Sequence, residues 1–161
     1  MSKNILLIDC CVRGEQSRTL ALARQWLAER EPEAQVDHLR LYDLDLSPLP
    51  LEEVETRQDT TLARQFAQAD EIVVAAPYWD LSFPAVLKVY LERICVTGVT
   101  FRYAGAAAEG LCRAKRAVYI STAGGLVGQR HLGEEYVRAV FQQLFGIPEF
   151  ETLRWEGLDL P

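Results

Sequence analysis

The clearest structural pattern in this chain lies in the segment Glu71-Ile72-Val73-Val74-Ala75-Ala76-Pro77-Tyr78-Trp79-Asp80-Leu81-Ser82-Phe83-Pro84. It begins with an apolar, β-branched run, which predicts a buried strand over 71–76. Two prolines then bracket a loop with two large aromatic residues, and residues 84–97 carry apolar side chains at helical spacing. Open α/β sheets bind ligands at the loops that follow the carboxyl ends of parallel strands. We therefore expect the functional site of this protein at the loop 77–83.

Strand and helix patterns alternate along the rest of the chain. The expected strands are 4–9, 35–41, 71–76, 114–121 and 150–155, and the expected helices are 17–30, 60–68, 84–97 and 132–145, the last closed by Gly146. Residues 43–55 are acidic and punctuated by proline, which favours a loop, and 99–103 are expected to form a short extension or hairpin arm. The alternation predicts an α/β protein with a five-stranded parallel sheet in the order 2-1-3-4-5 and helices on both faces. No helical pattern follows Trp155, so we expect the last strand at a protected edge, under a partner chain, or in a shortened chain.

Size and composition limit the class of protein. The 161 residues fit one domain, 1–161, and the formal net charge of -6 argues against nucleic acid as the main partner. No apolar run approaches the roughly 20 residues of a membrane span, and Asp9 interrupts the first apolar run too early for a signal peptide, so we expect a cytoplasmic protein. The four cysteines lack Cys-x-x-Cys spacing and only two histidines accompany them, so no metal site is expected.

The loop after the first expected strand, residues 10–19, ends at a helix start. Exposed amides and the positive end of the helix dipole make such a place an anion site. Ser17 and Thr19 would add hydroxyl groups there, and Arg13 and Arg18 would add charge. On this loop alone, capping of the helix by Ser17 is the simpler interpretation.

A third loop, residues 121–126, contains the adjacent glycines Gly124 and Gly125. By itself it could be an ordinary turn, although glycines also let a backbone approach a ligand closely. All three loops follow central strands of the predicted sheet, so they should converge at one edge. This convergence favours a ligand with an anionic tail at the first loop and a flat ring between the other two, and riboflavin phosphate has this shape.

These loops resemble those of the flavodoxin-like NAD(P)H:quinone reductases and FMN-dependent azoreductases. The family's Ser-Pro-Arg…Ser-x-Ser phosphate loop is similar to Cys11-Val12-Arg13 and Ser17-Arg18-Thr19, and its Ala-Pro-Met-Tyr-Asn-Phe loop to Ala76-Pro77-Tyr78-Trp79-Asp80-Leu81. Gly98-Val99-Thr100-Phe101-Arg102-Tyr103 resembles a family motif nearly letter for letter, and Thr122-Ala123-Gly124-Gly125 stands for the family's Ser-Arg-Gly-Gly. The resemblance covers essentially the whole chain.

The resemblance implies a flavodoxin-like three-layer sandwich, here without its final covering helix. It implies an enzyme that binds FMN rather than FAD and passes hydride from NADH or NADPH to quinone, azo or nitro acceptors. The flavin carries this chemistry, so no residue is assigned as a catalytic acid or base. The residues expected to bind the cofactor are Cys11, Arg13, Ser17, Arg18, Thr19, Pro77, Tyr78, Trp79, Asp80, Leu81, Thr122, Ala123, Gly124 and Gly125.

The resemblance also implies a homodimer, in which Tyr103 edges the substrate pocket of its own or the neighbouring subunit. The sequence favours a dimer independently, because the helix 84–97 carries apolar residues on more than one face, namely Val86, Leu87, Val89, Tyr90 and Ile94.

Several residues depart from the family pattern. Cys11 replaces a serine hydroxyl with a weak hydrogen-bond donor, and Ala123 removes an arginine. Asp80 replaces an asparagine, so its carboxylate would either lie beside the flavin and lower its potential or cap the next turn. Cys10 and Cys11 are adjacent, and because neighbouring strand residues point to opposite faces, packing and ligand contact are favoured over a strained disulfide.

Two other functions compete with a reductase. An electron-carrying flavodoxin or a flavin-dependent regulatory protein would use the same fold, but residues 101–103 and the aromatic loop favour the reductase. Low-molecular-weight tyrosine phosphatases carry Cys-x5-Arg after their first strand. Here Cys11 and Arg18 are one residue too far apart, and Ser17 occupies the place of the arginine.

Overall fold

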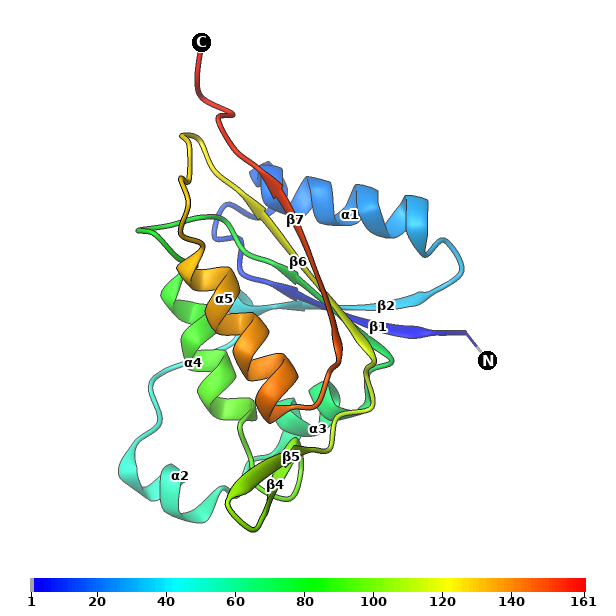
Figure 1. The fold of residues 1–161 in the computed structure, drawn as a ribbon, viewed down its shortest axis with the longest axis vertical. Helices are drawn as coiled ribbons and strands as arrows, with labels where there is room; N and C mark the ends of the chain where they lie inside the picture. Colours follow the sequence, from blue (N-terminus) through cyan, green and yellow to red (C-terminus); the bar gives the residue numbers. More distant parts are fainter. Residues whose placement is uncertain (1) are drawn as a thin grey trace.

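The computed structural model describes residues 2–161, and its centre is a five-stranded parallel sheet (Figure 1). The strands are β1 (Asn4–Asp9), β2 (Gln35–Arg40), β3 (Glu71–Ala75), β6 (Arg116–Thr122) and β7 (Glu149–Trp155). Their order is β2-β1-β3-β6-β7. Because β6 and β7 are the fourth and fifth strands of this sheet along the chain, this is the predicted order 2-1-3-4-5. All four pairings are parallel, so the fold prediction is confirmed.

Helices cover both faces of this sheet and give three layers. Helix α1 (Arg18–Arg30) lies on one face, and α3 (Thr61–Gln68), α4 (Ala85–Ile94) and α5 (Leu132–Ala139) lie on the other (Figure 1). Each face has its own apolar core. Leu20, Ala23 and Leu27 of α1 pack with residues such as Val73 and Val118, while the larger core on the opposite face contains Phe66, Tyr90 and Phe141.

The segment 43–55, expected to be a loop, overlaps a short helix, α2 (Leu51–Thr56). Pro50 stands at its N-cap and Glu52 and Glu53 fall in its first turn, where the helix dipole favours negative charge. The proline and acidic residues that favoured a loop are thus also helix-start signals. None of its residues is buried, and its two apolar residues, Leu51 and Val54, are too few to mark a helix in the sequence.

The helix predicted over 132–145 is not uniform. The α-helix ends at Ala139, and Val140–Leu144 continue as a π-helical turn in which Phe145 N donates to Val140 O at 3.1 Å. Phe141 and Phe145 are fully buried, and both rings pack against Phe66. The wider turn brings these two rings onto a single partner, a tertiary contact that apolar spacing alone does not predict.

A β-hairpin follows α4. A hairpin arm was one of the two structures predicted for residues 99–103. It consists of β4 (Phe101–Ala104) and β5 (Ala107–Gly110), paired antiparallel. The hairpin lies at the end of the molecule opposite the loops that follow β1, β3 and β6 (Figure 1). Helix α4 itself ends at Ile94, three residues before the predicted end, and the Thr100 hydroxyl donates to Ile94 O at 2.7 Å.

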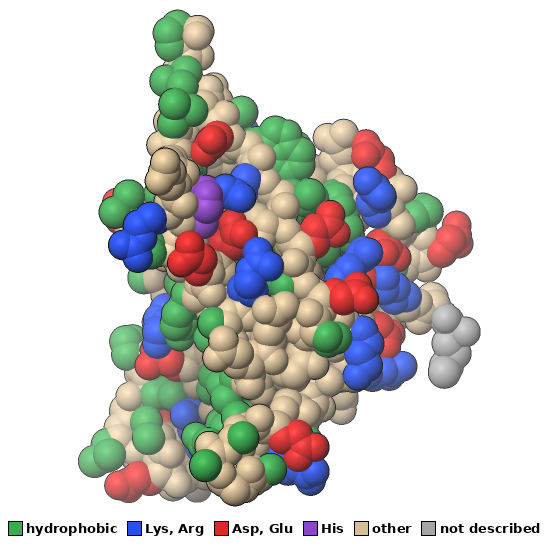
Figure 2. All heavy atoms as spheres, in the orientation of Figure 1, with side chains coloured by type: hydrophobic (Ala, Val, Ile, Leu, Met, Phe, Trp, Pro, Cys, Tyr) green, Lys and Arg blue, Asp and Glu red, His purple; other side chains and the backbone are tan. Residues whose placement is uncertain are grey.

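Helix α4 is less apolar around its circumference than its sequence suggested. Leu87, Tyr90 and Ile94 are buried, but Lys88 and Glu92 form an exposed ion pair at 3.6 Å on the outer side. Hydrophobic side chains do gather on the neighbouring surface, at the lower left of the face over α2 and α4 (Figure 2). In the described part of the chain, no helix combines the length and apolarity needed to cross a membrane.

Candidate functional site

The three predicted loops meet at the carboxyl edge of the sheet and enclose one pocket. Most of the residues expected to bind the cofactor line it, and the full lining is Cys11, Val12, Arg13, Ser17, Arg18, Thr19, Pro77, Tyr78, Trp79, Thr122 and Gly124. The predicted residues outside this lining are Asp80, Leu81, Ala123 and Gly125. The convergence of the loops is therefore confirmed.

One end of the pocket has the character of an anion site. The hydroxyl of Ser17 accepts a hydrogen bond from Leu20 N at 3.2 Å, so the predicted cap of α1 is present. The hydroxyls of Thr19 and Thr122 are hydrogen-bonded at 2.7 Å, which ties the first loop to the third. The first amides of a helix have no acceptor within it, and the positive end of the dipole of α1 reinforces them. Arg13 and Arg18 supply full positive charges beside these groups.

The aromatic loop is held in a defined shape by backbone hydrogen bonds. Tyr78 N donates to Thr122 O at 3.0 Å, and Trp79 and Ser82 exchange two bonds of 2.9 and 2.8 Å. Asp80 and Leu81 form the tip of this tight turn with φ of 51° and 68°, a left-handed conformation that costs energy for non-glycine residues. Such strain is found where a surrounding structure fixes a functional loop.

Asp80 therefore sits exposed at the turn tip. The N-cap of α4 is Pro84, whose side chain has no group that can accept a hydrogen bond, and Asp80 lies four residues before it. The interpretation that Asp80 caps the next turn is wrong. Its carboxylate is free to face a ligand or solvent.

The glycine loop is covered by the chain that follows β7. Leu158 N donates to Ala123 O at 3.2 Å and Asp159 N donates to Gly124 O at 2.9 Å. The Asp159 carboxylate also pairs with Arg18 at 2.9 Å. A Cβ on Gly124 would lie 2.0 Å from Asp159 Oδ2, so only glycine permits this approach. Sequence reasoning missed Asp159, because nothing in its local sequence shows that it reaches α1.

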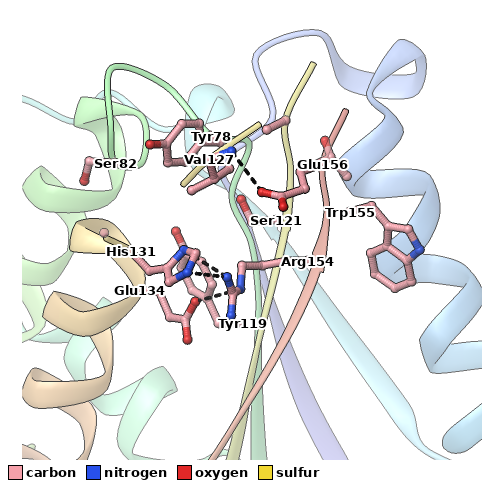
Figure 3. Close-up of a pocket in the computed structure, with 13 residues that line it drawn as sticks. Tyr78, Ser82, Tyr119, Ser121, Val127, His131, Glu134, Arg154, Trp155 and Glu156 are labelled. Carbon is pink, nitrogen blue, oxygen red and sulfur yellow. Dashed lines mark hydrogen bonds and ion pairs between the residues drawn. The ribbon is translucent and has the colours of Figure 1, made fainter. Parts of the chain in front are cut away.

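A second pocket adjoins the first on the α5 side of the sheet (Figure 3). Figure 3 shows His131, Glu134 and Arg154 pointing toward one another in this pocket. Arg154 Nε lies 3.1 Å from Glu134 Oε2, and Arg138 donates to Glu134 Oε1 at 3.0 Å. Tyr78, Thr122 and Ala123 border this pocket as well, so Ala123 faces it instead of the first pocket. The charged cluster was not predicted, since β7 and α5 carry its members far apart in sequence.

Comparison with known proteins identifies the family. A family model described as the flavodoxin-like fold matches residues 3–161. The FMN-dependent NADH:quinone oxidoreductase 2 of Clostridium acetobutylicum is 38% identical over 99% of this chain and 88% of its own. The chain belongs to the flavodoxin-like family of these NADH:quinone oxidoreductases. A second member, the FMN-dependent NADH:quinone oxidoreductase of Lachnoclostridium phytofermentans, is 35% identical over 99% of this chain and 88% of its own.

Solved structures agree with this fold. The azoreductase of Bacillus anthracis superposes on this flavodoxin-like chain with a TM-score of 0.84 at 23% identity, covering 98% of this chain and 88% of that one. An FMN-dependent NADH-azoreductase from the same species, solved in complex with FMN, gives a TM-score of 0.80 at 20% identity over 100% of this chain and 90% of that one.

The adjacent cysteines of this flavodoxin-like protein are free thiols on opposite sides of the sheet. Cys10 belongs to the core beneath α4, and Cys11 to the core beneath α1. Burial raises the pKa of Cys11 to about 12 and that of Cys10 well above its usual value. Both are therefore neutral near pH 7, whereas a phosphatase nucleophile must be a thiolate. The phosphatase alternative is not compatible with this environment.

Tyr103 does not reach the pocket of its own chain. It is 68% exposed on β4 and packs edge-on against Phe101, with ring centroids 5.5 Å apart. Its hairpin lies at the opposite end of the molecule (Figure 1). Of the two places expected for Tyr103, the pocket of its own subunit is wrong, because α4 carries the chain away from the site before the hairpin forms. The pocket of a neighbouring subunit stays a prediction.

Proposed function

We propose that this protein is an FMN-dependent NAD(P)H oxidoreductase of the quinone reductase and azoreductase type, with residues 1–161 as one flavin-binding domain. It would take hydride from NADH or NADPH and deliver it to quinone, azo or nitro acceptors. The observation that carries this proposal is the single pocket that joins the N-terminus of α1 to the aromatic loop. The names of the relatives, which are FMN-dependent NADH:quinone oxidoreductases, support it.

The residues present fit the phosphate end of FMN. Ser17 and Thr19 are 7% and 1% exposed, so a phosphate would meet their hydroxyls in a largely dry environment. Hydrogen bonds to an ionised phosphate are about twice as strong as neutral ones. Arg13 and Arg18 line the same end and would balance its charge.

The other end of the pocket fits a planar ring. We assign residues 77–82 and 122–125 to the ring of the flavin, which supplies hydride transfer when it is bound. The phenolic oxygen of Tyr78 is buried and has no hydrogen-bond partner among the described residues. A buried polar atom without a partner is costly, so a ligand that offers one would be stabilised there.

Exposed apolar side chains at the rim of the pocket fit an aromatic acceptor. Val12 is 48% exposed on the first loop, Leu81 63% on the second and Leu126 74% on the third, and Trp79 lies 40% exposed between them. Exposed apolar side chains that gather at a pocket mark a ligand or interaction site. A carrier that only exchanges electrons would not need to bind an organic acceptor, so the rim favours the reductase over the flavodoxin-type carrier or regulatory protein.

We also propose a homodimer that completes the acceptor site. Apolar residues are exposed beside α4, with Leu51 at 73%, Val54 at 48% and Tyr136 at 39%, and a second copy could bury them. In such a pair the exposed Tyr103 of one subunit would edge the pocket of its neighbour. Light scattering during gel filtration tests the assembly, and a monomer with full quinone reductase activity would exclude the shared site. The four free thiols support a cytoplasmic location.

Titration with FMN tests the cofactor assignment. FMN fluorescence should be quenched on binding, and riboflavin, which lacks the phosphate, should bind much more weakly. Equal affinity for FMN and riboflavin would contradict the phosphate site, and no binding of either would contradict the flavin assignment.

A further inference from the structure

A buried carboxylate lies directly beneath the first loop. Asp9, the last residue of β1, is 1% exposed, and its Oδ1 accepts a hydrogen bond from Cys11 N at 2.8 Å. This bond fixes the point at which the chain leaves the sheet and enters the loop. Tight turns complete the loop, with Gly14 N bonded to Cys11 O and Ser17 N to Gly14 O. The position of the cap at Ser17 therefore depends on a chain of contacts that starts at Asp9.

Two basic side chains of the neighbouring strand face this carboxylate. His38 Nε2 lies 2.9 Å from Asp9 Oδ2, and Arg40 Nε lies 3.7 Å from the same oxygen. Arg40 and Asp9 are also direct neighbours in the register of β2 and β1. Arg40 Nε is buried without a hydrogen-bond partner within residues 2–161. Arg40 thus acts on Asp9 mainly through its charge.

Arg40 also touches the loop itself. Gly14 has φ of +55°, and a Cβ at this position would lie 2.9 Å from Arg40 Nη2. The guanidinium therefore packs against the backbone at the turn that precedes Ser17. Figure 1 shows the setting, with β2 beside β1 and the loop running from the end of β1 into α1.

We propose that Asp9, His38 and Arg40 form a charge-balanced support that positions the phosphate loop, so that the preference for FMN over riboflavin depends on Arg40 balancing Asp9. This inference rests on the proposed function. The buried carboxylate of Asp9 organises the loop but would repel a phosphate dianion bound above it. Arg40 offsets that charge while it holds Gly14 in place.

Two other acidic side chains lie near Arg40 and the loop. Asp43 Oδ2 lies 3.6 Å from Arg40 Nε, which adds negative charge to the same place. Arg24 donates two hydrogen bonds to Glu15, of 2.5 and 2.9 Å, so the charge of Glu15 is already paired. Loss of Arg40 would thus leave the negative groups in excess beneath the loop.

A purely structural role predicts a different outcome from charge balance. If Arg40 only supports the fold, its removal should weaken FMN and riboflavin equally, and removal of the Asp9 charge should not repair the loss. If the charges balance, Arg40→Gln should weaken FMN about tenfold and riboflavin less than about twofold, and Asp9→Asn should restore FMN affinity in the double variant. An asparagine keeps an oxygen that can accept from Cys11 N.

The experiment compares the dissociation constants of FMN and riboflavin for the wild type, Arg40→Gln, Asp9→Asn and the double variant, by flavin fluorescence. Arg64→Gln on α3 is the matched control, because it removes the same charge from an exposed site remote from the loop. The proposal requires that Arg40→Gln loses affinity for FMN but not for riboflavin. In the double variant the dissociation constant for FMN should return to within about threefold of the wild-type value.

Equal losses for both ligands, or no recovery in the double variant, would overturn the proposal. If Arg40→Gln does not fold, the single variant Asp9→Asn decides the question: its FMN preference should equal or exceed that of the wild type, and a lower preference would overturn the proposal. A wild type that binds FMN no better than riboflavin would instead refute the phosphate site, so the two failures are distinguishable.

Discussion

Asp159 Oδ1 accepts a hydrogen bond from Arg18 Nη1 at 2.9 Å, which places a carboxylate of the terminal segment beside a cation of the proposed phosphate site. The backbone fixes this relationship, because Asp159 N is bonded to Gly124 O on the glycine loop. Both side chains are largely exposed, at 49% and 67%, so the pair itself contributes little to stability. The pair should instead affect ligand binding, because Asp159 competes with the phosphate for Arg18.

The first prediction is that Asp159→Asn tightens FMN binding. Removal of the carboxylate frees Arg18 and reduces the negative charge near the phosphate, so the dissociation constant should fall about two- to fivefold at low salt and less at high salt. Fluorescence titration at two salt concentrations measures this effect. Asp45→Asn, an exposed change elsewhere, controls for net charge. Weaker FMN binding in Asp159→Asn would show that the pair supports the site.

The second prediction concerns the hydroxyls at the start of α1. Replacing Ser17 and Thr19 together by alanine should weaken FMN markedly, because each lost charge-assisted hydrogen bond costs about 1.5–3 kcal/mol. Riboflavin affinity should change little. Loss of the Ser17 cap should also lower the free energy of unfolding by about 1 kcal/mol. A double variant with unchanged FMN affinity would refute the assignment of these hydroxyls.

The third prediction concerns thiol reactivity. Burial raises the pKa of Cys11 and Cys112 to about 12 and that of Cys95 to about 11. At pH 8 the folded protein should react slowly with iodoacetamide at these positions, and all should react fast after unfolding in urea, as mass spectrometry would show. Rapid labelling of Cys11 in the folded protein would contradict its environment.

The same shifts predict a pH dependence of stability. A folded pKa raised above the unfolded value means that the unfolded chain loses protons first as the pH rises. The contribution of the buried thiols to the free energy of unfolding should therefore be full below pH 9.0, the ordinary thiol pKa. It should decline as the pH rises from 9.0 toward about 12. Chemical denaturation at pH 7 and pH 10 measures the decline. Equal stability at the two values would contradict the burial of these groups.

The fourth prediction tests the packing of the hairpin on the π-helical turn. A Cβ at Gly110 would lie 2.2 Å from Gly146 N and from the carbonyl carbon of Phe145, both backbone atoms that cannot move independently. Gly110→Ala should cost about 1–3 kcal/mol of stability. Gly125→Ala is the control, since no atom lies within 4 Å of its Cβ position. Melting temperatures that match in the two variants would show that the hairpin is not packed this way.

Features carried by local patterns could be predicted from the sequence. The apolar runs of the strands and the loops that follow them were enough for the sheet order and for the convergence of Ser17, Tyr78 and Thr122. Helix α2 was missed because it has only six residues, and its two apolar residues, Leu51 and Val54, are too few to mark a helical pattern. The π-helical turn was missed because its cause is a tertiary contact with Phe66.

Contacts that depend on strand register lay beyond sequence reasoning. Arg40 meets Asp9 only because β2 pairs with β1 in one particular register, and Asp159 meets Arg18 only because the chain after β7 folds back over Gly124. The family motif placed Tyr103 at the pocket of its own or the neighbouring subunit. The direction of α4 takes it away from its own pocket, since α4 runs from the site to the far end of the sheet (Figure 1).

Catalytic turnover tests the proposed function most directly. The protein loaded with FMN is mixed with excess NADH and a soluble quinone, and NADH consumption is followed, with free FMN at the same concentration and the Ser17→Ala/Thr19→Ala variant as controls. The proposed function requires many equivalents of NADH consumed per protein, at a rate well above free FMN and reduced in the variant at limiting FMN. Consumption that stops after one equivalent, or that only matches free FMN, would contradict a reductase and leave a flavin carrier.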